Sequence, residues 1–560
     1  MENTKNSVKR KERDELSLEN TFRQIKLSWP HINNIKIYKA MKIILELGLQ
    51  QSIFGEHHYQ GLKSVAKLLI DQSNISEVNE LLEFAIDKDE TEAVKIVLKH
   101  GIEINAKLPK SQMTPIQLSS AKGLSQITQV LIKNGACVDT QDIKRLTLLQ
   151  QAIINKDIEL IELLINHGAN VHTKGRNERP LILALENGLL EVAELLIKND
   201  ANINTQSSWN ATPLQICSEK GYLKIAKVLI EKGAILDSAD VVGVTPLQEA
   251  VQHTNREIFH LLMKKKVNPN PETTDGFTPL HSAAGKGEIE VARILLEAGA
   301  MTEKRNTYGM FPIHLAVFSK KAEMVKLLIK FRANINQIVV PFPSNSSSPF
   351  LHHTPLLLAV SEGLEDIVKV LINNGADLEI PDDMRLTPLL KAIMWKKNRI
   401  SKLLISNGAN VHATYGNPGQ HFTPLHLSVY KENEEISKNL ILNGASVSAK
   451  FNYTCGYTTP LYYAITKRNV EICRMLICAG ADVNAKDSPG LTLIHFAIHF
   501  GRNASKHSEV LKTRQIIQLL IQNGACSNKQ NIYGQSPDEI TLSQKKIEMV
   551  KFINWCKSQV

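Results

Sequence analysis

A glycine followed by alanine recurs along most of this chain, and each copy comes directly after an apolar run. Successive copies and their degenerate equivalents lie 32 to 36 residues apart, with two wider gaps. The complete copies are Gly135-Ala136, Gly168-Ala169, Gly233-Ala234, Gly299-Ala300, Gly375-Ala376, Gly408-Ala409, Gly444-Ala445, Gly480-Ala481 and Gly524-Ala525. Self-similarity at such a period is typical of repeat architectures, in which each unit buries its apolar face against its neighbours. The period therefore predicts a stack of repeats rather than a globular enzyme core.

A threonine-proline pair precedes most of these glycines. The most complete copies are Thr278-Pro279-Leu280-His281 and Thr423-Pro424-Leu425-His426. Threonine can accept a backbone N–H at a helix start, and proline suits the first helical position because its missing N–H is not needed there. Each pair therefore predicts the start of a short helix. Weaker copies begin at Thr114, Thr147, Thr212, Thr245, Phe311, Thr354, Thr387, Thr459 and Thr492.

The leucine-rich runs between these motifs predict a second helix in each repeat. The glycine then ends that helix in a left-handed conformation, which glycine adopts without strain. Three repeats hold Asp200, Lys266 and Arg332 in place of the glycine. We expect these three repeats to be locally weaker than the others.

The two motifs together resemble the ankyrin family, whose repeat carries a T-P-L-H-x-A signature and two antiparallel helices. The resemblance implies an all-α repeat solenoid. It would be an ankyrin array of about 13 helix-turn-helix repeats with β-hairpin loops and capping helices. In that arrangement the signature histidines are structural and hydrogen-bond toward neighbouring loops. They are His281, His314, His426 and His495.

The repeat register predicts the domain organisation. Residues 1–40 are polar and predicted to be disordered, and residues 41–75 are predicted to form a helical N-terminal cap or a degenerate repeat. The array spans residues 76–530, with insertions near 337–353 and 501–511 that we expect to be loops. Residues 531–560 are predicted to form a C-terminal capping repeat.

Composition and charge restrict the functional classes. The net charge is +10, but lysine and arginine alternate with acidic residues, so we do not expect a nucleic-acid partner. The seven cysteines form no disulfide framework, and the sequence shows neither an apolar run long enough to cross a membrane nor an apolar leader. We therefore expect a cytoplasmic, monomeric protein, with nuclear entry or secretion into a host cell as alternatives.

The sequence also lacks the short motifs that usually carry chemistry. It has no phosphate-binding glycine loop and no zinc-binding spacing. We expect no catalytic activity, cofactor, metal or small-molecule substrate, and we expect a scaffold or adaptor that binds a partner protein. The alternatives are an effector that an intracellular bacterium secretes to bind a host protein, and a substrate-recognition subunit of a ubiquitin ligase. A further alternative is an enzyme with an unrecognised site near one end of the chain.

The resemblance implies that a partner binds the concave face, through the loop tips and the ends of the first helices. Aromatic residues and methionine, which are enriched in interfaces, gather at these positions in the later repeats. An alternative is that they pack against the insertion near 337–353 as a private core. The predicted partner-binding residues are Tyr308, Met310, Phe318, Met384, Met394, Trp395, Tyr430 and Phe500.

Three asparagines, Asn204, Asn336 and Asn484, lie in the turn after the second helix. This position resembles the ankyrin asparagine that an oxygen-dependent asparaginyl hydroxylase modifies. The alternative is a structural role, in which the side chain hydrogen-bonds within the hairpin.

Overall fold

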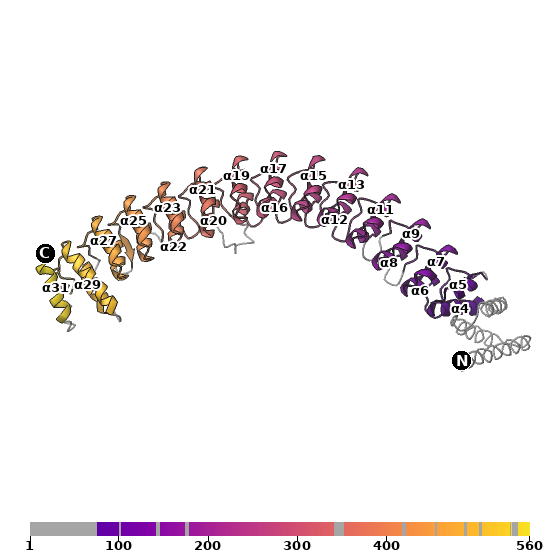
Figure 1. The fold of residues 1–560 in the computed structure, drawn as a ribbon, viewed down its shortest axis with the longest axis horizontal. Coiled ribbons are helices and arrows are strands. Elements are labelled where there is room, and N and C mark those ends of the chain that lie inside the picture. Colours follow the sequence, from indigo (N-terminus) through magenta and orange to yellow (C-terminus); the bar gives the residue numbers. More distant parts are fainter. Residues whose placement is uncertain are drawn as a thin grey trace, which may run out of the picture. The chain divides into compact units, whose positions relative to one another are not determined.

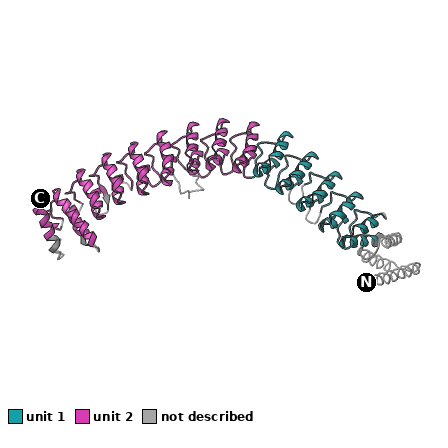
Figure 2. Cartoon of the chain, in the orientation of Figure 1, with its two compact units in different colours: residues 1–241 teal, residues 242–560 magenta. Residues whose placement is uncertain are grey.

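The computed structural model shows a chain of short helices that pack in pairs (Figure 1). It divides into two compact units, Met1–Val241 and Val242–Val560, which Figure 2 colours separately. The structure describes residues 75–99, 102–141, 146–173, 179–340, 352–416, 422–453, 456–486, 490–502, 507–531, 533–537, 539 and 547–559. The segment predicted for 1–40 and the cap predicted for 41–75, except Ile75, lie outside these ranges.

The described part of the first unit holds five helix pairs. In each pair the two helices pack against each other, and each first helix also packs on the first helix of the next pair in the same unit. The pairs are α4 (Ile75–Asp87) with α5 (Thr91–Leu98), α6 (Pro115–Ala121) with α7 (Ser125–Lys133), α8 (Leu148–Asn155) with α9 (Ile158–Asn166), α10 (Pro180–Glu186) with α11 (Leu190–Lys198), and α12 (Pro213–Lys220) with α13 (Leu223–Glu231).

The described part of the second unit holds eight pairs and one further helix, so the two units together contain the thirteen predicted repeats. The first four pairs are α14 (Pro246–Gln252) with α15 (Arg256–Lys264), α16 (Pro279–Lys286) with α17 (Ile289–Glu297), α18 (Pro312–Phe318) with α19 (Ala322–Lys330), and α20 (Pro355–Glu362) with α21 (Glu365–Asn373). The others are α22 (Pro388–Met394) with α23 (Asn398–Ser406), α24 (Pro424–Tyr430) with α25 (Glu434–Leu442), α26 (Pro460–Thr466) with α27 (Val470–Cys478), and α28 (Leu493–Arg502) with α29 (His507–Gln522), followed by α31 (Ile547–Ser558).

The first helices begin as the threonine-proline motif predicts. In six repeats the threonine hydroxyl accepts the backbone N–H three residues later, and the side chain at that later position accepts the threonine N–H in return. These pairs are Thr114–Gln117, Thr147–Gln150, Thr212–Gln215, Thr245–Gln248, Thr278–His281 and Thr423–His426. Glutamine and histidine therefore fill the same position, because each offers an acceptor and a donor on one side chain.

The second helices end in the left-handed conformation that the glycine motif predicts. Gly233 has a φ of 89° and Gly299 a φ of 90°. Where the glycine is missing the backbone turns in the same way, with φ of 61° at Asp200, 57° at Lys266 and 64° at Arg332. Neighbouring repeats therefore hold these non-glycine residues in a conformation that costs about 1 kcal/mol each.

The core of each unit consists of leucine, isoleucine, valine and alanine from both helices. Leu280, Ala283 and Ala284 of α16 are fully buried, as are Ala292 and Leu295 of α17. The alanines let consecutive helices approach closely, while each buried leucine stabilises the stack by about 1.5–3 kcal/mol. The predicted all-α repeat fold is confirmed.

The loops between repeats contain less regular β-structure than the predicted hairpins. Among the described loops, strands pair only between β1 (Phe451–Tyr453) and β2 (Gly456–Thr458), which run antiparallel. Three further loops contain a single bridge each. Elsewhere an asparagine or aspartate closes the turn: the Asn306 side-chain oxygen, for example, accepts the N–H groups of Tyr308 and Met310. In such a loop, hydrogen bonds from a side chain to the backbone thus take the place of backbone hydrogen bonds between two strands.

The insertion predicted near 501–511 is largely helical rather than a loop. Arg502 is the last residue of α28, and residues 507–511 form the start of α29, which is 16 residues long where most second helices have nine. Only residues 503–506 of that range lie outside the described chain. The extra residues extend the helices because the segment contains no proline to end them.

The C-terminal helix α31 packs against α29. Ile553 and Cys556 are buried, whereas Trp555 on the same helix is exposed. Residues 532, 538, 540–546 and 560 of the predicted capping repeat lie outside the described residues.

The turn asparagines connect neighbouring repeats rather than bonding only within their own hairpin. The side-chain oxygen of Asn204 accepts the N–H of Ile235, that of Asn336 accepts the N–H of Asp377, and that of Asn484 accepts the N–H of Cys526, at 2.8–2.9 Å. These asparagines therefore have a structural role that acts between repeats. Whether they are hydroxylated stays a prediction.

Candidate functional site: an aromatic groove

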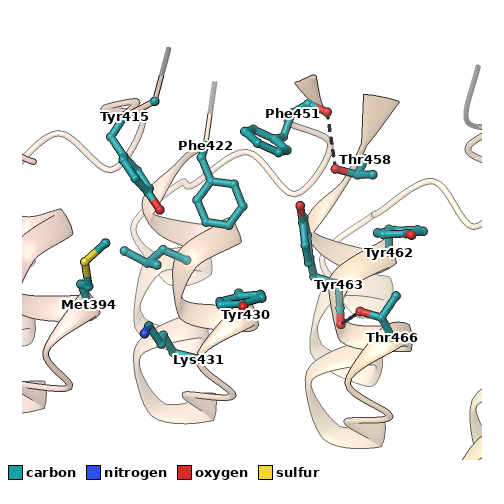
Figure 3. Close-up of a pocket in the computed structure, with 12 residues that line it drawn as sticks. Met394, Tyr415, Phe422, Tyr430, Lys431, Phe451, Thr458, Tyr462, Tyr463 and Thr466 are labelled. Carbon is teal, nitrogen blue, oxygen red and sulfur yellow. Dashed lines mark hydrogen bonds between the residues drawn. The ribbon is translucent and has the colours of Figure 1, made fainter. Parts of the chain in front are cut away.

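A groove crosses the ends of three consecutive first helices in the second unit (Figure 3). Its cavity volume is about 520 Å³, which lies within the usual range of ligand sites. We call it the aromatic groove; helices α22, α24 and α26 and the loops before α24 and α26 line it. The lining residues are Met394, Tyr415, Gly416, Phe422, Leu427, Tyr430, Lys431, Phe451, Thr458, Tyr462, Tyr463 and Thr466.

Aromatic rings contact one another throughout the groove. The ring centroid of Phe422 lies 4.8 Å from that of Phe451, 5.6 Å from that of Tyr463 and 5.6 Å from that of Tyr415. The rings of Tyr430 and Tyr463 are 6.0 Å apart and nearly perpendicular. Edge-to-face contacts of this kind add to the stabilisation that burial provides. The groove is therefore a preformed aromatic surface.

The rings differ in exposure. Phe422 and Phe451 are buried, whereas Tyr430 is 45% exposed and Tyr415 and Tyr463 are half-buried. Figure 3 shows Tyr415, Phe422 and Phe451 reaching in from the loops, and Tyr430 and Tyr463 projecting from the helices. The phenylalanines thus support the tyrosines, which present both an apolar ring and a hydroxyl to a ligand.

Positive charge lies at the helical end of the groove. Lys431 is the one charged residue among the lining residues, and the Lys467 ammonium lies 4.5 Å from the centre of the Tyr430 ring. Burial, and then the nearby Tyr430 hydroxyl, raise the pKa of Tyr415 above its usual value. Tyr415 is therefore protonated at neutral pH and can donate a hydrogen bond.

His426 packs against aromatic residues that line the groove. Its imidazole is buried beside Phe422 and Tyr463, at centroid distances of 5.4 and 6.1 Å. Burial lowers the pKa of His426 to about 4. The ring is neutral at physiological pH and acts as part of the helix cap rather than as a charged ligand.

The structure brings two of the predicted partner-binding residues together in this groove, Met394 and Tyr430. Trp395 directly follows Met394 and is 57% exposed. The groove lies in the later repeats, where we expected the partner-binding residues to gather, and its lining runs from Met394 to Thr466.

The other predicted residues lie away from the groove. Tyr308 and Met384 are exposed in loops, and the Tyr308 ring is 6.3 Å from that of Phe277. Met310 and Phe318 are half-buried, and so is Phe500, whose carbonyl accepts a hydrogen bond from Arg468. Of the eight predicted residues, Met394 and Tyr430 therefore line the groove and the other six do not.

Several groove residues were not predicted from the sequence, namely Tyr415, Phe422, Phe451, Tyr462 and Tyr463. A signal was available in the last two. Tyr462 occupies the position that histidine or glutamine fills in the capped repeats, and α26 begins without a threonine side-chain cap. The ring instead packs on Phe496, with centroids 4.6 Å apart. An aromatic residue at the capping position was therefore the available sequence signal for this repeat.

A buried ion pair lies beside the insertion near 337–353. The Lys391 ammonium is 2.7 Å from the Asp382 carboxylate and 2.6 Å from Nε2 of His353, and the side chains of the ion pair are 7% and 1% exposed. His353 in turn pairs with Val339 through a backbone hydrogen bond of 3.0 Å. Residues 341–351 lie outside the described chain, so the private-core alternative for Phe318 and its neighbours stays open.

A second hollow lies in the first unit, between α6 and α8. It is lined largely by amide side chains, including Gln112, Gln117, Gln141 and Gln151, and has a volume of about 680 Å³. Amide groups there already bond within the chain, since the Gln117 side chain donates to the Gln141 carbonyl. The hollow lacks the aromatic residues that dominate binding energy in interfaces.

The described residues show neither a metal-binding cluster nor a membrane-spanning helix. They contain no group of three or more histidine, cysteine, aspartate or glutamate residues placed to hold a metal ion. Within the same ranges, no helix has the length and apolar character that a membrane crossing requires.

Comparison with known proteins gives two similar sequences. A segment of 119 residues is 33% identical to the glycerophosphocholine phosphodiesterase gde1 of Schizosaccharomyces pombe, and covers 20% of this chain and 10% of that protein. A segment of 154 residues is 27% identical to the putative ankyrin repeat protein FPV244 of Fowlpox virus, and covers 26% of this chain and 22% of that protein. The chain thus matches less than a quarter of the length of either relative.

Family comparisons cover most of the chain. The model described as ankyrin repeats (3 copies) matches residues 116–207, 181–273, 247–339, 341–415 and 413–487, and the model described as ankyrin repeats (many copies) matches residues 461–521. Repeats of this kind indicate a protein–protein interaction scaffold. With the thirteen helix pairs and their threonine and glycine caps, these matches show that the chain belongs to the ankyrin repeat family.

Proposed function

We propose that this protein is a non-catalytic scaffold or adaptor that binds a partner protein in the aromatic groove. The observation that carries the proposal is the cluster of half-exposed tyrosines on a buried aromatic base. Tyrosine rings that are held in place lose little conformational freedom on binding, and they are typical of the residues that contribute most to interfaces.

The similarity to a phosphodiesterase does not favour an enzymatic function. It covers a tenth of that enzyme, so it gives no reason to transfer the activity to this chain. The family match favours binding, because the exposed surface of stacked repeats is extended and suits a macromolecular partner.

The experiment compares three full-length baits in lysate of the cells that express the protein. These are the wild type, the groove variant Tyr430→Ala/Tyr463→Ala, and the matched control Trp209→Ala/Tyr533→Ala. The control removes two aromatic side chains outside the groove, both of them exposed. Circular dichroism establishes that all three baits are folded.

We expect a partner that the wild type and the control retain and the groove variant loses, with a decrease in affinity of about 2 kcal/mol or more. Equal capture by the groove variant and the wild type would place the binding surface elsewhere. A separate Trp395→Ala bait tests whether the exposed neighbour of Met394 contributes to the same surface.

A further inference from the structure

We propose that the aromatic groove binds an extended acidic segment of a partner protein. A large apolar side chain of that segment lies on the tyrosine rings, and an aspartate or glutamate faces Lys431 and Lys467. This inference rests on the proposed function and adds the chemistry of the partner.

The shape of the groove favours a narrow ligand. Its lining runs from Met394 in α22 to Thr466 in α26, so an occupant crosses three consecutive repeats. Apart from the peptide backbone, most of the lining consists of aromatic rings, Met394 and Leu427. An extended peptide with one large apolar side chain fits this surface, because only a few side chains fit into about 520 Å³.

The positive charge at the groove favours a ligand that carries a negative group. Among the described residues, neither Lys431 nor Lys467 takes part in an ion pair with a carboxylate. Other cations nearby do have such partners: Lys402 on α23 pairs with Glu435, and Arg468, which directly follows Lys467, lies 3.3 Å from Glu509. The two lysines at the groove thus remain available for a carboxylate of the ligand.

The three connections that follow the groove helices share this positive character. They hold Lys396 and Lys397 after α22, Lys431 after α24, and Lys467 and Arg468 after α26, with Glu432 as the one acidic residue. The connections after α10 and α20, by contrast, contain no lysine or arginine. Basic connections also occur elsewhere, such as Lys320 and Lys321 after α18. At the groove, Lys431 belongs to the aromatic lining and Lys467 contacts the Tyr430 ring, so this surface suits an acidic, apolar segment.

The first step of the test selects nonapeptides from a random display library on the full-length chain. The groove variant Tyr430→Ala/Tyr463→Ala serves for counter-selection. We expect the groove-dependent peptides to carry aspartate or glutamate within two residues of a large apolar residue. Groove-dependent peptides that are basic or uncharged would overturn the inference and leave the groove as a binding site.

The second step measures the affinity of one selected peptide by fluorescence anisotropy. Lys431→Glu/Lys467→Glu should weaken binding at least tenfold, and added salt should weaken wild-type binding. The matched control Lys369→Glu/Lys402→Glu makes the same charge change on the second helices α21 and α23, where both lysines are exposed. It should leave the affinity within twofold.

A charge swap separates recognition from a structural role of the lysines. A peptide with lysine in place of its acidic residues should bind the Lys431→Glu/Lys467→Glu variant at least fivefold more tightly than it binds the wild type. If the lysines only complement the negative ends of the helix dipoles, the Lys431→Glu/Lys467→Glu variant has a changed melting temperature but binds both peptides as the wild type does. The inference then fails.

The remaining outcomes are also decisive. A phosphoserine peptide that binds more than tenfold more tightly than the glutamate peptide would assign the groove to phosphorylated partners and overturn the acidic-segment proposal. If lysate capture depends on the groove but no groove-dependent peptide emerges, the occupant is a folded surface, and this inference fails while the proposed function stands. If capture does not depend on the groove either, both fail.

Discussion

Nε2 of His281 lies 3.2 Å from the carbonyl oxygen of Met310, which belongs to the loop of the following repeat. Nδ1 of the same ring accepts the backbone N–H of Thr278, at 3.2 Å. One neutral imidazole therefore caps its own helix and bonds to the next repeat. Gln248 does the same in another repeat, because its amide oxygen accepts the Thr245 N–H and its amide nitrogen donates to the Phe277 carbonyl.

Acid should destabilise the protein through these histidines. Burial lowers the pKa of His281, His314 and His426 to about 4, below the ordinary value of 6.5. The unfolded chain takes up protons below pH 6.5 that the folded chain does not accept until the pH approaches 4. The stability that these histidines contribute is therefore present above pH 6.5 and is lost as the pH falls through this window. The free energy of unfolding should decrease by roughly 2 kcal/mol per histidine between pH 7 and 5.

Urea unfolding at pH 7 and pH 5 measures this loss. The control is the triple variant His281→Gln, His314→Gln, His426→Gln, which keeps the capping geometry that glutamine provides in four other repeats. It should show a much smaller pH dependence. Equal pH dependence in the variant and the wild type would assign the acid sensitivity to other groups.

Glycine should stabilise the three repeats that lack it at the end of the second helix. Asp200→Gly, Lys266→Gly and Arg332→Gly should each raise the free energy of unfolding by about 1 kcal/mol, because the backbone is left-handed there. Denaturant midpoints measure the gain. Lys227→Gly, at an exposed position inside α13, should instead lower the free energy of unfolding by about 1 kcal/mol. A lower midpoint for any of the three variants would contradict the prediction.

Removal of one partner of the buried ion pair should be costly. Lys391→Met leaves the Asp382 carboxylate buried without its cation, and we expect a loss of about 3 kcal/mol in unfolding free energy. Lys326→Met breaks an exposed pair with Glu323 and should cost less than about 1 kcal/mol. The difference in thermal midpoint between the two variants measures the effect of burial, and similar midpoints would show that the Lys391 pair contributes little.

The asparagine bridges should hold neighbouring repeats together. Asn484→Ala removes two hydrogen bonds to the following repeat, one from the Cys526 N–H and one to the Gly524 carbonyl. We expect the free energy of unfolding to fall by about 1–2 kcal/mol and hydrogen exchange at the Cys526 amide to become faster. Asn443→Ala removes a side-chain bond within one helix end and serves as the control. Unchanged exchange at Cys526 would argue against the bridge.

The helix starts and ends could be predicted because their causes are local. Thr278 accepts the N–H of a residue three positions later, and Gly233 turns left-handed at a single position. The prediction that the second insertion forms a loop was wrong, since nothing within residues 507–511 stops α29 from starting early. Proline and glycine often decide such boundaries, but residues 507–511 contain neither, and Gly501 lies within α28 without ending it.

The aromatic groove was predicted only in part. Met394 and Tyr430 occupy equivalent positions of consecutive repeats, so the repeat register finds them. Phe422 and Phe451 come from loops whose lengths differ, and the register does not show that their rings meet at 4.8 Å. Only the folded chain brings loops and helix ends to one place.

The sequence alone determined the ankyrin fold, the number of repeats and the starts and ends of most of the described helices, because every one of these depends on contacts within about 35 residues. The tertiary structure decided which aromatic residues share a surface, which lysines there lack a carboxylate partner, and that the Lys391 and Asp382 charges are buried as a pair. These properties depend on how side chains of neighbouring repeats pack and exclude water, and spacing along the chain does not fix that packing.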